Sequence, residues 1–342
     1  HEAGNKAKEG QTMGDLFCHA ATFARIADRL KPFADMLSPL TMDNAGALAR
    51  PWGGEVPETP DLTVVYGTQD AYFSPAAAQF FQYLMAAPSI GWFQSSAAGI
   101  EHPVLRAVGA KSGAFTSSHE QSAAIAEWAL WAGLDHFQNG PARRAAQARG
   151  EWLREGFREI GETRWLIIGF GHIGQASAAR LKALGAHVTG VRRSEGTHPD
   201  ADLIIHPRDL PAHLPEADAV LLCPPLTPET EDMADAAFFA AMQPGALLLN
   251  VGRGKLVDEE ALLAWLETGR PGAAYLDVVR EEPLPAGHAF WSHPAVTLTA
   301  HISAKTDAAK QRSDALFLEN LEAFRGGTQM RNLVPRSEFE IP

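Results

Sequence analysis

The chain has 342 residues, of which 46% are hydrophobic and 20% charged, and its formal net charge is −12. These proportions are typical of a soluble globular protein, and the length favours two domains over one compact core. The negative charge argues against general nucleic-acid binding, so any anion site must be local. No run approaches the roughly 18 apolar residues of a membrane span. We therefore expect a protein that binds neither nucleic acid nor membrane.

The first dozen residues, 1–12, are polar and lack the apolar core of a signal peptide. We expect them to be a frayed extension or an addition to the native chain, so Met13 could be the native start. The two cysteines, Cys18 and Cys223, cannot form a disulfide framework and indicate a reducing compartment. The prediction is a cytoplasmic protein, and no metal site is predicted.

Residues 14–118 predict a first α/β region of modest regularity. Its strands are predicted at 16–19, 62–66 and 91–94, with a helix over 21–37 and a loop rich in Pro and Gly over 50–60. An alanine-rich helical stretch, 120–137, follows this region. That helix could simply connect two regions, or it could pair two copies of the chain.

A glycine pattern follows the short apolar segment 165–168, which predicts a buried strand. Gly169 would make the tight turn, Gly171 would let the backbone approach a pyrophosphate, and Gly174 would let the next helix pack on the strand. A plain strand–helix corner is the alternative. Because another strand is predicted at 187–191, the order strand, turn, helix and strand favours a dinucleotide-binding fold.

The choice of dinucleotide depends on residues near these glycines. The helix begins with His172 and Ile173, and the free N–H groups at its start are expected to hold the phosphates. A fold selective for NAD carries an acid about 20 residues further on, which binds the ribose 2′-hydroxyl. Here the second strand ends in Arg192, Arg193 and Ser194, which can bind a 2′-phosphate, although both arginines could be solvated surface cations. We predict that NADP(H) is preferred and NAD(H) possible.

Beyond the glycines, predicted strands and helices alternate, which indicates a parallel, doubly wound sheet with right-handed crossovers. No predicted strand follows the final helix, 314–324, so this helix is expected to return to the first region. The other predicted segments are strands at 203–205, 219–222, 246–250, 273–277 and 296–299, and helices at 230–242 and 259–268.

The predicted fold class is therefore α/β with two doubly wound domains. A Rossmann domain that binds NAD(P), 120–303, is inserted into a discontinuous, flavodoxin-like substrate domain. The first part of that substrate domain is 13–119, and 304–342 supply its return helix and tail.

Polar residues follow three of the predicted strands, at the sheet edge where open α/β sheets bind ligands. They are Arg253, Glu282 and His301. A planar guanidinium can bind a carboxylate at two points, an imidazolium can protonate a carbonyl oxygen, and a carboxylate can fix the imidazole tautomer. Taken singly, the three could be a loop cation, a surface acid and a packed histidine. Because all three follow strands of a predicted dinucleotide-binding fold, at the same edge of its sheet, they predict the reduction of a 2-oxo acid.

At these residues the chain resembles the D-isomer-specific 2-hydroxyacid dehydrogenase family, over about 91–324. The matching segments are 169–174, 222–230, 250–254, 277–285 and 299–302. The resemblance implies a catalytic triad of Arg253, Glu282 and His301, and a homodimer whose substrate domain closes over the cofactor.

Further site residues are implied by the same resemblance. The substrate-carboxylate loop of the family matches Ala97, Ala98 and Gly99, whose backbone N–H groups would bind the anion. Asp277 matches the acid that contacts the nicotinamide amide, although it could equally cap the end of its strand. The other residues implied on the cofactor side are Pro224, Pro225, Thr230, Val251 and Gly252.

The chain also departs from the family pattern. Ala300 stands where proline commonly precedes the histidine, which could loosen that turn. Glu282 is chosen over Glu281 because it directly precedes Pro-Leu-Pro, and a glutamate there speaks against formate dehydrogenases, which carry glutamine. The segment 288–291 is similar to the short glyoxylate/hydroxypyruvate reductase branch. Tyr72, Phe73 and Trp291 could line the substrate pocket or be ordinary core aromatics.

The predicted function is NAD(P)H-dependent reduction of a 2-oxo acid, such as glyoxylate or hydroxypyruvate, to the D-2-hydroxy acid. The nicotinamide would give the hydride, the His–Glu pair the proton, and the arginine would hold the substrate carboxylate. Two alternatives stay open: a dinucleotide-sensing protein similar to transcriptional corepressors, and a phosphonate-type oxidoreductase on the same scaffold.

Overall fold

The computed structural model describes residues 14–58, 60–100 and 102–339. The expected extension, 1–12, and Met13 lie outside the described residues, so their predicted character is untested. Within the described ranges, no helix has the length and apolar character needed to cross a membrane.

The chain divides into two compact units. One unit combines His1–Glu120 with Lys310–Pro342, and the other is Gln121–Ala309, so the second is inserted into the chain of the first. The domain roles assigned from the sequence to 13–119, 120–303 and 304–342 stay predictions.

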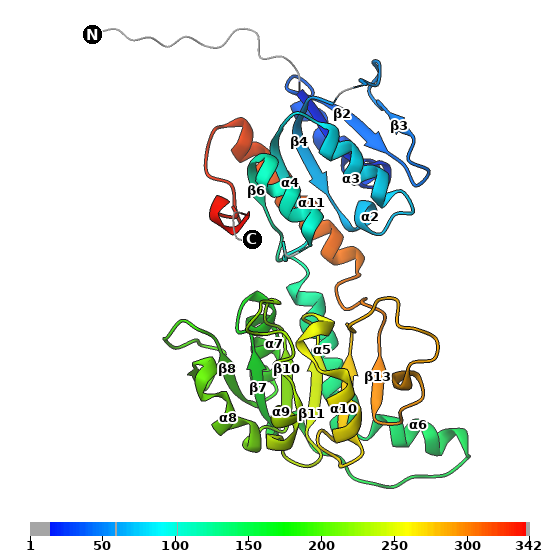
Figure 1. Cartoon of the computed structure of the whole chain (residues 1–342), viewed down its shortest axis with the longest axis vertical. Helices are drawn as coiled ribbons and strands as arrows, with labels where there is room; N and C mark the ends of the chain where they lie inside the picture. The colour runs from blue at the N-terminus through cyan, green and yellow to red at the C-terminus, as the bar shows by residue number, and fades with distance from the viewer. Residues whose placement is uncertain (1–13, 59, 101, 340–342) are drawn as a thin grey trace. The chain divides into compact units, whose positions relative to one another are not determined.

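The first unit is built on a six-stranded sheet in the order β3-β2-β1-β4-β5-β6 (Figure 1). All neighbours pair in parallel except the short edge strand β3, which is antiparallel to β2. Without β3, this is the 2-1-3-4-5 order of flavodoxin-like folds. The strands are β1 (Gly14–His19), β2 (Leu37–Met42), β3 (Leu48–Ala49), β4 (Leu62–Gly67), β5 (Ile90–Ser95) and β6 (Ser112–Thr116).

Alternate residues of these strands point to opposite faces, and each face buries its own cluster of apolar side chains. Phe17 and Phe93 pack on the side of α3 and α4, whereas Leu16 and Trp92 pack with Phe317 of α11 and with residues of α1. The helices are α1 (Ala20–Leu30), α2 (Gln69–Tyr72), α3 (Ala77–Ala86), α4 (Pro103–Lys111) and α11 (Asp307–Arg325).

The helix predicted over 21–37 was wrong in its last turns. The α-helix stops at Leu30 and a 3₁₀ turn, Lys31–Phe33, contains Pro32, which lacks the N–H that a continuing helix needs. Strand β2, which then begins, and strand β6 were not predicted. Pro39 interrupts the apolar pattern of β2, and Gly113 interrupts that of β6. Both strands are nevertheless largely buried in the sheet.

The second unit holds a seven-stranded parallel sheet in the order β13-β12-β11-β10-β7-β8-β9. The first strand of this sheet along the chain is β7; β8 and β9 are then added on one side of it, and the chain crosses to β10 on the other. This is the order of a Rossmann fold, with its switch point between β7 and β10. The strands are β7 (Arg164–Ile168), β8 (His187–Val191), β9 (Leu203–Ile205), β10 (Ala219–Leu222), β11 (Leu247–Asn250), β12 (Ala273–Leu276) and β13 (Val296–Leu298).

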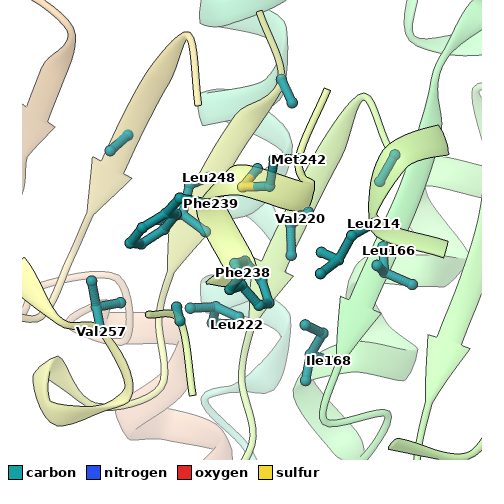
Figure 2. Close-up of a cluster of buried hydrophobic side chains, with 14 of the residues drawn as sticks. Leu166, Ile168, Leu214, Val220, Leu222, Phe238, Phe239, Met242, Leu248 and Val257 are labelled. Atoms are coloured by element: carbon teal, nitrogen blue, oxygen red, sulfur yellow. The ribbon is translucent and has the colours of Figure 1, made fainter. Parts of the chain in front are cut away.

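Two buried clusters cover the faces of this sheet. Figure 2 shows the first cluster, in which Leu166 and Val220 of the strands meet Phe238, Phe239 and neighbouring apolar side chains. Trp165 of β7 belongs to the opposite cluster, with side chains of α5 and α7. The helices are α5 (Ser122–Phe137), α6 (Gly140–Ala148), α7 (His172–Ala183), α8 (Leu210–His213), α9 (Ala236–Ala241) and α10 (Glu259–Leu266).

The helix predicted over 230–242 was also wrong, because only its second half is helical. Helix α9 begins after Asp235, whose carboxylate accepts the N–H of Phe238 at 2.9 Å. Before it, Asp232 has a φ of 53°, which an α-helix cannot contain. The residues after β10 therefore form a loop at the sheet edge. The fold class predicted from the sequence, two doubly wound α/β domains, is confirmed.

Candidate active site

The glycine turn lies at the carboxyl end of the inner strand β7. Gly169 has a φ of 92°, and a Cβ there would lie 2.4 Å from the backbone nitrogen of Pro224. A Cβ at Gly174 would lie 2.8 Å from the carbonyl oxygen of Gly169, whereas one at Gly171 would meet no described atom within 4 Å. Two of the glycines thus allow close packing and Gly171 faces open space. Helix α7 starts at His172 without a side-chain cap, so the turn fits a dinucleotide pyrophosphate.

The loop after β10 lies beside this turn because β10 pairs with β7. The Thr230 hydroxyl donates to the carbonyl of Pro225 at 2.7 Å and accepts the N–H of Thr227 at 2.8 Å. The Cys223 thiol contacts the carbonyl oxygen of Gly169 at 3.2 Å. The predicted residues Pro224, Pro225 and Thr230 therefore form one closed loop against the glycine turn.

The residues predicted to choose the cofactor follow β8, on the other side of β7. Arg192 donates from Nε to the carbonyl oxygen of Ser194 at 3.1 Å, and Arg193 and Ser194 are exposed. The pKa of Glu229 is lowered, mainly by the Thr227 hydroxyl and in smaller part by the charge of Arg193. This cation therefore lies within electrostatic reach of the loop after β10.

A short turn after β11 presents Arg253. Asn250 is buried and shapes this turn, because its side chain accepts the N–H of Gly252 at 3.0 Å and donates to the carbonyl of Arg253 at 2.9 Å. The Arg253 guanidinium donates to the carbonyl of Gly252 at 2.8 Å. Gly254, which follows Arg253, packs against the loop after β12. A Cβ at Gly254 would lie 1.9 Å from the carbonyl carbon of Val279 in that loop.

His301 and Glu282 form a direct pair. Their Nδ1 and Oε2 atoms are 2.8 Å apart, and the other carboxylate oxygen accepts the N–H of Val279 at 3.2 Å. Their side chains are 43% and 38% exposed, so the pair is open on one side. Glu282, rather than its neighbour Glu281, makes this contact.

The charges of the pair reinforce each other. The hydrogen bond that His301 donates to Glu282 raises the pKa of His301 more than burial lowers it. Burial alone would raise the pKa of Glu282, but the hydrogen bond and charge of His301 bring it below its usual value. The positive charge of Arg253 lowers the pKa of both groups, so the three side chains are electrostatically connected. The arrangement favours an imidazolium beside a carboxylate.

Asp277 holds the turn that carries His301. Its buried carboxylate accepts the Thr299 hydroxyl at 2.6 Å, the N–H of Ile302 at 2.9 Å and the N–H of Ser303 at 3.1 Å. His301 itself has a φ of 54° and donates its N–H to the Asp277 carbonyl at 2.8 Å. These bonds fix the turn although Ala300 replaces the usual proline.

These contacts favour the role of Asp277 as a cap at the end of its strand. Its contact with the nicotinamide amide stays a prediction. Thr299 also accepts the indole N–H of Trp128 at 3.0 Å, which links the turn to α5. Neither Thr299 nor Asn250 was singled out from the sequence. Both are polar residues within one position of the carboxyl end of a strand, and this pattern could have identified them from the sequence.

The predicted substrate residues are spread over both units. Ala97, Ala98 and Gly99 follow β5 in the first unit, where the Ala97 N–H donates to the Ser95 hydroxyl at 3.0 Å. Tyr72 is partly buried and its hydroxyl also bonds Ser95, so it supports this loop. Trp291, in the second unit, is exposed and donates its indole N–H to the carbonyl of Pro285 at 2.9 Å. Pocket lining by Tyr72 and Trp291 stays a prediction.

We expect Gly254→Ala to lower kcat/KM by roughly 10²-fold, because the new methyl group must push the Arg253 turn and the Glu282 loop apart. Steady-state kinetics together with thermal unfolding would test this. Gly287→Ala is the matched control, since a Cβ there meets no described atom within 4 Å. Equal kinetics for the two variants would contradict the close approach of the loops.

The chain is similar to known proteins both in sequence and in fold. Residues 130–303 match the family described as "D-isomer specific 2-hydroxyacid dehydrogenase, NAD binding domain". The chain is 35% identical to a glyoxylate reductase of Pyrococcus furiosus over 203 residues, which are 56% of this chain and 60% of that protein. It is 37% identical to glyoxylate/hydroxypyruvate reductase B of Citrobacter koseri over 173 residues, 50% of this chain and 53% of that one. The matches thus span little more than half the length of these relatives.

Solved structures share the fold over nearly the whole chain. An NADPH-dependent glyoxylate/hydroxypyruvate reductase from Sinorhizobium meliloti, in complex with NADP and sulfate, has a TM-score of 0.77 at 22% identity, covering 96% of this chain and 99% of that one. A D-isomer specific 2-hydroxyacid dehydrogenase from Xanthobacter autotrophicus, in complex with NADPH and MES, has a TM-score of 0.76 at 24% identity, with the same coverage. From the matched family domain, together with the Rossmann sheet and its glycine turn, we conclude that this chain belongs to the D-isomer-specific 2-hydroxyacid dehydrogenase family.

Proposed function

We propose that this protein reduces a 2-oxo acid to the D-2-hydroxy acid with a nicotinamide dinucleotide. The observation that carries the proposal is the His301–Glu282 pair at 2.8 Å, within electrostatic reach of Arg253. All three follow strands of a parallel sheet at the edge where the glycine turn lies. The names of the reductases to which the chain is similar support glyoxylate and hydroxypyruvate as first substrates to test.

Each of the three residues has a distinct role in the proposed reaction. Arg253 binds the substrate carboxylate through its planar guanidinium. Glu282 occupies Nδ1 of His301, so the proton at Nε2 is the one delivered to the carbonyl oxygen. The nicotinamide, when bound, supplies the hydride. In the first unit, the amides of Ala98 and Gly99 are proposed to bind the carboxylate of a 2-oxo acid.

Turnover of a panel of 2-oxo acids with NADPH and NADH tests the proposal. Reduction of glyoxylate, hydroxypyruvate or a larger 2-oxo acid would support it. A protein that only senses the dinucleotide would bind NADPH but turn over none of them, and a phosphonate-type oxidoreductase would prefer a non-carboxylate substrate. Either result would contradict it.

We further propose that the enzyme prefers NADPH over NADH. Arg192, Arg193 and Ser194 follow β8 without an acid among them, so they suit a 2′-phosphate. Replacing both arginines with glutamine is expected to raise the KM for NADPH by about 10- to 100-fold, because charge-assisted hydrogen bonds are lost. The KM for NADH should change little. Added salt should weaken the wild-type preference because it screens these charges.

The matched control for this pair is Arg208→Gln, which removes an exposed arginine elsewhere in the same unit. It should leave both cofactor KM values unchanged. A wild-type enzyme with equal or better kcat/KM for NADH would overturn the proposed preference.

The proposal also includes a homodimeric state and a cytoplasmic location. Trp152 is 85% exposed and Phe157 and Trp131 are also exposed, which supports a second copy of the chain as the partner that covers them. Light scattering would show a homodimer or exclude it. Cys18 and Cys223 are both free thiols, which supports the cytoplasmic location.

A further inference from the structure

A chain of hydrogen bonds connects α2 to the loop that follows β5 in the first unit. The hydroxyl of Tyr72, the last residue of α2, is 3.0 Å from the Ser95 hydroxyl, and either group can donate. Ser95, the fully buried last residue of β5, also accepts the N–H of Ala97 at 3.0 Å. One buried hydroxyl therefore joins the tyrosine to the loop backbone.

The space around Tyr72 is fitted to this contact. A Cβ at Gly67 would lie 2.5 Å from the Tyr72 hydroxyl oxygen and 2.6 Å from the Phe93 ring, so only glycine leaves room for the phenol. Burial raises the pKa of Tyr72, although its bond with Ser95 opposes the shift. The phenol therefore stays neutral.

The same loop is held at two more points. The N–H of Ser96 donates to the carbonyl of Gly67 at 2.8 Å, and the carbonyl of Ala97 accepts the N–H of Ser118 at 3.2 Å. Both backbone groups of Ala97 are thus engaged. Among the described residues, the amides of Ala98 and Gly99 donate to none.

We propose that Tyr72, through Ser95, is a positioning residue that fixes the loop so that the amides of Ala98 and Gly99, and not that of Ala97, bind the carboxylate of the 2-oxo acid. This inference rests on the proposed function, which places the carboxylate at this loop. Tyr72 is assigned a place behind the binding surface instead of the pocket lining predicted from the sequence.

The test compares Tyr72→Phe with Tyr66→Phe. Tyr66 is a matched control because it is buried in the same unit and its hydroxyl donates to Asp314 of α11 at 3.0 Å instead of bonding Ser95. Both variants lose one buried hydroxyl, so a purely structural effect would be similar in the two. Only Tyr72→Phe removes a bond to Ser95.

We expect Tyr72→Phe to raise the KM of the best 2-oxo acid and the inhibition constant of oxamate by roughly 3- to 10-fold, as expected for one lost hydrogen bond. The KM for the nicotinamide cofactor should not change. Ser95→Ala should do the same, and the double variant should be no worse than Ser95→Ala, because both changes break one chain of bonds. Hydrogen exchange over 96–100 should rise in Tyr72→Phe and not in Tyr66→Phe.

Equal oxamate inhibition and equal hydrogen exchange in the two tyrosine variants would overturn the inference while leaving the proposed function intact. A wild-type protein that turns over no 2-oxo acid and binds no oxamate would overturn both. Additive effects of Tyr72→Phe and Ser95→Ala would also contradict the positioning chain, because they would show that the two side chains act separately.

Discussion

His301→Ala is expected to reduce turnover of the best 2-oxo acid by roughly 10²–10⁴-fold, because the variant lacks the side chain that we propose as the general acid for the carbonyl oxygen. The Nδ1 contact with Glu282 at 2.8 Å directs the remaining ring nitrogen to this task. The kcat should fall while the dissociation constant of NADPH, measured by fluorescence titration, stays close to that of the wild type. A lower kcat with unchanged cofactor binding would show that the variant is impaired in the chemical step.

The pH profile gives a second test of the same residue. The hydrogen bond that His301 donates to Glu282 raises the pKa of His301 above its usual value, so the imidazolium persists to higher pH. Reduction should therefore be constant at low pH and decline as pH rises through this raised pKa, whereas oxidation of the hydroxy acid should rise. Glu282→Gln removes the main cause of the shift, so its decline should begin at lower pH.

His187→Ala is the matched control for His301→Ala. His187 is 43% exposed, as His301 is, and it too lies beside an acid, with Nδ1 3.5 Å from Asp202. It stands at the amino end of β8, away from the glycine turn. Its loss should leave turnover unchanged. Wild-type rates and an unaltered pH profile in His301→Ala would remove the histidine from the reaction.

Much of the second unit could be predicted from the sequence because its inner strands β7, β10 and β11 are short, largely apolar and buried. The strand at β7 was visible from four apolar residues followed by Gly169, and β10 was visible from a similar apolar run. In the first unit the signal failed where Pro39 and Gly113 stand inside buried strands. Sheet pairing overrode the local pattern at both positions.

The site shows a similar division. The order of strand ends in the sequence was enough to group Arg253, Glu282 and His301, because parallel strands finish at one edge. The bonds that orient them were not predictable, since Asp277 acts through atoms of residues more than twenty positions away. The role of Tyr72 likewise depends on Ser95, which lies 23 residues along the chain. Side-chain contacts of this kind require the folded geometry.

Arg253→Lys is expected to lower kcat/KM for the best 2-oxo acid by about 10- to 100-fold, because lysine keeps the charge but cannot form the two-point contact with a carboxylate. Cofactor affinity should survive. Arg253→Gln removes the charge as well. Since the charge of Arg253 lowers the pKa of His301, this second variant should retain its residual reduction to higher pH than the wild type, whereas Arg253→Lys should not shift the profile.

The control for the arginine is Arg164→Lys, because Arg164 pairs with Glu216 at 2.8 Å at the amino end of β7, on the opposite edge of the sheet. It should not alter kinetics with any 2-oxo acid. If Arg253→Lys matched this control in kcat/KM, the guanidinium would not bind the substrate carboxylate. If only its KM for NADPH rose, Arg253 would belong to the cofactor site.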